Sequence, residues 1–163
     1  MFRELFGLPA HALIVHAAVV FIPLAALFAI LYAVWPAVRK HIWWIVLGLG
    51  ILAPASAWAA RLSGGEYEKI WVDERGATGG FVDEINNHQA LGNMLSWWTT
   101  ALGVAMLALV LYAVPRPGSK RAVPPKIVGL IGTIVTVALA AVTIYYVIRT
   151  GDAGARASHE ELS

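Results

Sequence analysis

Three histidines stand where two long apolar runs begin, and their type and position make them the best candidates for chemistry. His11 and His16 open one run, and His88 opens another. Neutral imidazole is the commonest nitrogen ligand for iron, copper and zinc near pH 7. The chain has no cysteine, which excludes disulfides, zinc–thiolate sites, cysteine-bound iron–sulfur clusters and c-type haem attachment. Haem b needs no cysteine. The other two histidines, His41 and His159, lie in polar segments and are expected to be solvated.

The spacing of the histidines indicates how they can pair. His11 lies 24 residues before Trp35 and His88 lies 26 residues before Val114, the ends of their runs. At about 1.5 Å per helical residue, the two imidazoles are expected at nearly the same depth. His16 follows His11 by five residues, or about 140° around a helix, so these two cannot face each other. Each of them can instead face His88.

A haem b between the two helices is therefore the expected cofactor, with His88 and one of His11 or His16 as axial ligands. Arg61 and Arg149 follow two other apolar runs at the same face and are expected to bind the haem propionates. The segments 11–16 and 88–93 are weakly alike, which suggests that the chain contains a parallel repeat.

Four alternatives remain open. Glu84 lies one helical turn before His88, and Glu84, His88 and His11 could hold a zinc, copper or manganese ion, with His16 as a further candidate ligand. A quinone-like pocket could form around Trp97, Trp98 and His88. The histidines could also be interfacial residues that only hydrogen-bond between helices, and then no cofactor is bound. The chain could be a structural subunit of a larger membrane or respiratory complex, or a homo-oligomer.

The elements that position these residues are four charge-free apolar runs. The chain has 163 residues, 59% of them hydrophobic and 13% charged, where a soluble domain carries about 25% charged residues. A spanning helix needs about 20 apolar residues, and backbone in lipid must satisfy its own hydrogen bonds. The sequence predicts an all-α integral membrane protein, a single domain over 1–163, with helices at about 10–35, 42–60, 89–114 and 127–148.

The links between the runs predict the topology. Short links at 36–41 and 115–126 predict two antiparallel hairpins, joined by a long loop over 61–87 with a short strand pair around 67–72. The short links hold six basic residues and no acid, so they are expected in the cytoplasm. Both termini and the long loop are then extracytoplasmic, in a bacterial plasma membrane. The net charge of +2 gives no reason to expect nucleic acid, and no complete catalytic set is found.

The opening segment, Leu-Pro-Ala-His-Ala-Leu-Ile-Val-His over 8–16, resembles that of an uncharacterised bacterial membrane family, domain of unknown function 2231. His88 fits the same pattern, and Thr-Gly-Asp-Ala-Gly-Ala-Arg over 150–156 resembles a segment after the family's last helix. The family often has a histidine where this chain has Asp152. The resemblance implies a four-helix membrane domain. Some relatives are joined to Rieske-type or cytochrome-type modules, which implies a respiratory role.

Overall fold

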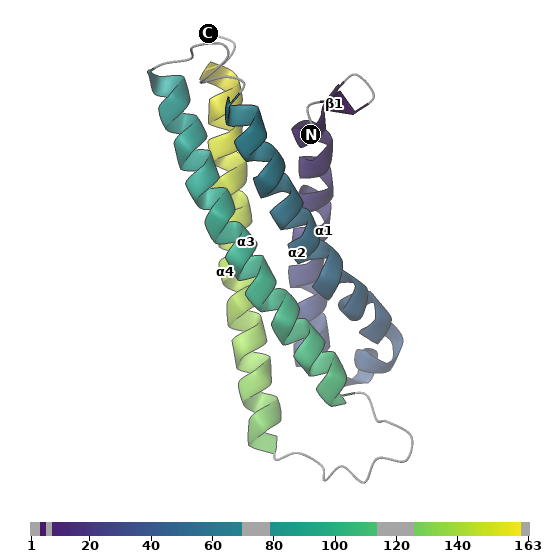
Figure 1. The fold of residues 1–163 in the computed structure, drawn as a ribbon. Coiled ribbons are helices and arrows are strands. Elements are labelled where there is room, and N and C mark those ends of the chain that lie inside the picture. Colours follow the sequence, from purple (N-terminus) through teal and green to yellow (C-terminus); the bar gives the residue numbers. More distant parts are fainter. Residues whose placement is uncertain (1–3, 6–7, 70–78, 114–125, 161–163) are drawn as a thin grey trace.

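The protein is a bundle of four long helices, seen in a computed structural model that describes residues 4–5, 8–69, 79–113 and 126–160 (Figure 1). The helices are α1 (Ala10–Val34), α2 (Arg39–Lys69), α3 (Gly80–Ala113) and α4 (Lys126–Glu160). A 3-10 turn, η1 (Pro36–Val38), links α1 to α2. Two short antiparallel strands, β1 (Glu4–Leu5) and β2 (Leu8–Pro9), precede α1. Each helix contains a segment long and apolar enough to cross a membrane.

Both α2 and α3 are longer than predicted. The expected loop over 61–87 is helical up to Lys69 and again from Gly80, so the expected strand pair is wrong over 67–69, and its remainder lies outside the described residues. Glu66 and Lys69 form an exposed ion pair one turn apart, which suits a helix in water. Gly79 has φ +74°, and its carbonyl accepts the first hydrogen bonds of α3. The fourth helix also continues past 148 to Glu160.

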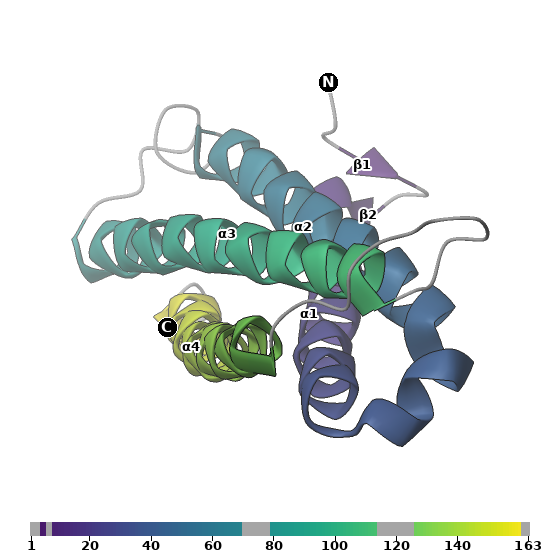
Figure 2. The same cartoon turned by 90° about the horizontal axis from the view of Figure 1, so that it is seen from below.

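The helices form a ring in which each packs against the next along the chain and α4 packs against α1 (Figure 2). The first and third helices begin, and the second and fourth end, at one end of the bundle, called here the histidine end (Figure 1). The core contains mostly small and aliphatic side chains, among them Ala25, Ala26, Ala29, Leu102 and Met106. Alanines at these positions let helix backbones approach closely, as is common in membranes.

Many of the buried positions of α1 and α2 have buried counterparts in α3 and α4. Five of the seven buried positions of α1, at 22, 25, 26, 29 and 33, recur 77 residues later in α3, at 99, 102, 103, 106 and 110. Four of the seven buried positions of α2, at 46, 50, 53 and 63, recur 90 residues later in α4, at 136, 140, 143 and 153. The pair α1–α2 and the pair α3–α4 thus share much of one packing pattern, which agrees with the parallel repeat suggested by the sequence.

Gly103 of α3 packs directly against the backbone of α2, and its replacement by alanine should destabilise the bundle. A Cβ on Gly103 would lie 2.5 Å from the carbonyl oxygen of Gly50 and 3.2 Å from Cγ of Pro54. Because a backbone carbonyl cannot move aside cheaply, we expect Gly103→Ala to cost about 1–3 kcal/mol of unfolding free energy. Unfolding by sodium dodecyl sulfate in mixed micelles measures this cost.

The matched control is Gly48→Ala on α2, where a Cβ meets nothing within 4 Å. Alanine is the better helix former, so this variant should be neutral or slightly more stable. Equal stability of the two variants would contradict the close approach.

Candidate functional site

His11 joins the start of α1 to the end of α2. Its Nδ1 lies 2.9 Å from Oγ of Ser63, and the Ser63 hydroxyl itself donates to the carbonyl of Ala60 at 3.0 Å. Ser63 therefore accepts, and His11 donates from Nδ1. The ring lies against Gly64, where a Cβ would come within 3.2 Å of Cε1. A side chain on residue 64 would require the imidazole to shift by a few tenths of an ångström.

His88 joins α3 to α4 in the same way. Its Nδ1 donates to the carbonyl oxygen of Thr150 at 3.0 Å, and its ring lies against Gly154, where a Cβ would come within 3.0 Å of Cε1. A carbonyl can only accept, so the proton is on Nδ1 and Nε2 of the neutral ring carries a lone pair. This is the arrangement in which histidine binds a metal, with the second nitrogen held by a carbonyl.

The two imidazole contacts are equivalent in the repeat. His88 lies 77 residues after His11, and Gly154 lies 90 residues after Gly64, the same shifts that relate the buried positions. The charge of a protonated His88 also lowers the pKa of His11. The common depth of the two imidazoles in the membrane stays a prediction.

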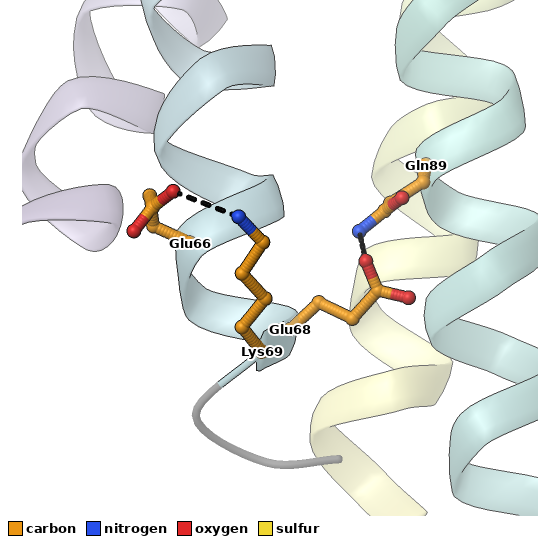
Figure 3. A network of polar contacts seen from close by, with 4 residues as sticks. All are labelled: Glu66, Glu68, Lys69 and Gln89. Carbon is orange, nitrogen blue, oxygen red and sulfur yellow. Dashed lines mark hydrogen bonds and ion pairs between the residues drawn. The ribbon is translucent and has the colours of Figure 1, made fainter. Parts of the chain in front are cut away.

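A polar cleft of about 550 Å³ opens between the end of α2 and the start of α3. Its lining includes His88, Arg61, Lys69, Asn86 and Asn93. Figure 3 shows its polar contacts: Lys69 pairs with Glu66 at 3.2 Å, and Gln89 donates to Glu68 across the gap between the helices. The cleft therefore carries both signs of charge beside an imidazole.

A smaller apolar cavity of about 110 Å³ adjoins this cleft, and all four helices line it. Cleft and cavity share four residues, Ala60, Arg61, His88 and Gly92. The imidazole of His88 thus stands where a polar recess and an apolar recess meet. His11 and His16 line neither of them.

The other predicted ligands are only partly brought together. Arg61 lines both recesses, with its guanidinium 5.1 Å from the ring centroid of Trp58. Arg149 does not reach them: it is exposed and donates to the hydroxyl of Tyr145 at 3.0 Å. His16 is also exposed. The structure therefore keeps His88 and Arg61 as one site and leaves Arg149 and His16 outside it.

The two alternative sites do not assemble as expected. Within the part of the chain that the structure describes, no three His, Cys, Asp or Glu residues come together to hold a metal ion. Glu84 has a buried Oε2 without a hydrogen-bond partner among those residues. Trp97 packs edge-on against Trp58 at 5.1 Å and Trp98 stacks with Tyr146 at 6.4 Å, and neither lines a recess with His88.

Sequence reasoning missed the residues that hold the imidazoles in place. Ser63, Gly64, Thr150 and Gly154 lie within the last turns of α2 and α4, where the sequence predicts a loop and a tail. One sequence signal could have found the two glycines. Gly154 lies 90 residues after Gly64 and His88 lies 77 residues after His11, so each histidine has a glycine at the corresponding place in its own half of the chain. No protein-family model, curated protein or solved structure matches this chain.

The pH dependence of stability should report the environment of His11. Burial lowers the pKa of His11, the nearby His88 lowers it further, and the hydrogen bond to the Ala60 carbonyl opposes both. The pKa of the folded state is thus below the ordinary value of 6.5. The unfolded chain then binds more protons than the folded one in acid, so this stability is fully present above about pH 6.5 and is lost as the pH falls.

We expect the melting temperature in detergent to drop by a few degrees between pH 7 and pH 5, and less steeply in His11→Gln. The exposed His41 supplies the control, since His41→Gln should keep the wild-type slope. An unchanged slope in His11→Gln would show that this imidazole is not the group responsible.

Proposed function

We propose that this chain is a membrane-embedded redox protein that holds a b-type haem at His88 and passes electrons to a partner, as a carrier or a respiratory accessory subunit. One observation carries the proposal: the Thr150 carbonyl holds Nδ1 of His88, at the junction of a 550 Å³ cleft and an apolar cavity. A fixed, neutral imidazole with a lone pair on Nε2 is what an axial haem ligand requires.

The surroundings of His88 suit a haem. The cleft volume lies within the roughly 300–1,000 Å³ usual for ligand sites. Arg61 and Lys69 line the same cleft and would bind propionates by charge-assisted hydrogen bonds. His88 would hold the haem through its Nε2, and His11 would position the helix ends beside it. When bound, the haem supplies one-electron redox chemistry.

A copper or zinc ion is less well supported, because Glu84, His11 and His88 do not form a three-ligand group in the described residues. A structural subunit is the second candidate function. Only 17% of the α4 span is buried, against 28–44% of the other three spans, so much of α4 is available to lipid or to another chain.

We also propose the membrane topology, which the basic links support. The 3-10 turn with Arg39 and Lys40 after it would lie in the cytoplasm, and the histidine end would lie outside, in a bacterial plasma membrane. The bundle is then two antiparallel hairpins with both termini extracytoplasmic. The loop between α2 and α3, over 70–78, and most of the link 115–126 lie outside the described residues. The resemblance to domain of unknown function 2231 stays a proposal that agrees with this arrangement.

Cysteine labelling tests the topology, because the chain has no cysteine of its own. Ser158→Cys on α4 should react with a membrane-impermeant maleimide in intact cells, whereas Ala37→Cys in η1 should react only after the membrane is opened. Both positions are exposed, so accessibility is matched. Labelling of Ala37→Cys in intact cells would reverse the orientation.

An absorption spectrum tests the haem. Protein expressed with added haem precursor should show a Soret band that shifts on reduction with dithionite, and His88→Ala should lower its absorbance per mole of protein about tenfold or more. His11→Ala is the matched control, because it removes the equivalent contact between α1 and α2 but no residue of the cleft. It should keep most of the haem.

Two outcomes would end the haem proposal. One is a folded wild-type protein without a Soret band despite adequate haem supply. The other is full retention of haem in His88→Ala, which would remove His88 from the site. Co-purification of such a haem-free chain with a larger complex would favour the structural subunit.

A further inference from the structure

The apolar cavity beside His88 has walls made almost wholly of carbon atoms. Residues such as Val15 and Ile22 of α1, Ala57 of α2 and Leu95 of α3 form these walls. The volume of about 110 Å³ is much smaller than that of the cleft. It holds three or four groups of about 30 Å³ each, the volume of a water molecule in the liquid.

The polar residues of this lining direct their hydrogen-bonding groups elsewhere. The hydroxyl of Ser96 donates to the carbonyl of Gly92 at 2.9 Å, and Nδ1 of His88 donates to the carbonyl of Thr150. The hydroxyl oxygen of Thr150 has practically no accessible surface, and the guanidinium of Arg61 lies over an indole ring. A water molecule needs two to four polar partners, so it is disfavoured here. The walls therefore suit a hydrocarbon guest.

The cavity reaches the outer surface of the bundle between α1 and α4. Val19 of α1 lines it and is 60% exposed, and Gly151 of α4 lines it and is exposed. Of the four pairs of neighbouring helices, α1 and α4 pack against each other least extensively. Both residues lie in segments apolar enough to cross a membrane, so the surroundings of this opening are expected to be lipid.

The depth of the cavity matches the inner part of one lipid leaflet. Val19 and Ile22 lie six and nine residues after Leu13, where the apolar segment of α1 begins. At about 1.5 Å per residue, the cavity lies about 9–14 Å inside the apolar layer. One leaflet supplies about 15 Å of hydrocarbon, so the ends of its acyl chains lie at this depth. The match does not depend on which face of the membrane the histidine end occupies.

We propose that this cavity binds the end of an acyl chain of a membrane phospholipid, from the leaflet at the histidine end. The chain passes between α1 and α4 beside Val19, and its last carbons contact Ile22 and Ala57. An unfilled apolar cavity forfeits dispersion contacts, and the chains of the bilayer are the hydrocarbon in reach. A helix of another protein is about 10 Å wide and does not fit. This site goes beyond the haem proposal and does not depend on it.

Photo-crosslinking tests the site in vesicles of phosphatidylethanolamine and phosphatidylglycerol. The probe is a phosphatidylcholine that carries a diazirine at the methyl end of one acyl chain. Ile22 and Ala57 are only 1% and 4% exposed, so a chain that stays outside the bundle does not label them. We expect mass spectrometry to find labels on both. Leu27 is 50% exposed and does not line the cavity, so its label reports ordinary lipid contact.

Val19→Trp places a bulky ring in the opening and should lower the labelling of Ile22 and Ala57 about tenfold, because a chain forced past it meets the cost of overpacking. The labelling of Leu27 should persist. The matched control is Val20→Trp, since Val20 is 53% exposed and does not line the cavity. It should label as the wild type does.

Two results would overturn the inference. One is a wild-type protein in which Leu27 is labelled but Ile22 and Ala57 are not. The other is equal labelling of Ile22 and Ala57 in the two tryptophan variants. The experiment needs no haem, so its result is independent of the Soret band that tests the proposed function.

Discussion

The contact between an imidazole and a glycine of the next helix is the interaction on which the histidine end depends. His11 on Gly64 and His88 on Gly154 both come so close that any Cβ would meet the ring within 3.0–3.2 Å. Glycine inside a helix costs about 1 kcal/mol relative to alanine, so keeping it here has to be offset by this contact. The hydrogen bond from each Nδ1 then fixes the ring plane, which decides where Nε2 points.

The two helix pairs share a scaffold but not a chemistry. The positions 61, 65 and 68, where α2 faces α3, correspond to 151, 155 and 158 of α4 in the 90-residue shift. The first set is Arg, Gly and Glu, and the second is Gly, Ala and Ser. The residues at the helix contacts differ as well. Gly50 and Gly103 lie between α2 and α3, whereas the equivalent positions of α4 and α1 are Ala140 and Ala26. At the three pairs of positions given first, charged side chains stand on α2 and not on α4, and Arg61 and Glu68 line the cleft with His88.

The sequence predicts the apolar segments that are long enough to span a membrane. It does not predict where the helices end in water, or which face of a helix points into the bundle. The four spans follow from hydropathy. The helix ends do not, because polar segments such as 61–69 continue as helix through local ion pairs and have no hydropathy signal. Arg149 shows the limit set by rotation: its neighbour Thr150 faces the bundle, while Arg149, about 100° further round, contacts Tyr145 at the surface.

The α1–α2 pair and the α3–α4 pair also differ in their buried side-chain oxygens that lack a hydrogen-bond partner. Among the described residues, the buried side-chain oxygens without a partner belong to Glu84, Thr99, Thr143 and Thr150, all on α3 and α4. The buried serines of α2, Ser56 and Ser63, instead donate to carbonyls of their own helix. A core selected only for packing would replace such threonines by valine, because an unsatisfied hydroxyl is costly in an apolar interior. Of these four residues, Thr150 alone lines a recess that His88 also lines, whereas Thr99 and Thr143 lie in the fully buried core and line neither recess. The unpaired oxygens of α3 and α4 thus fall partly in the packed core and partly beside His88.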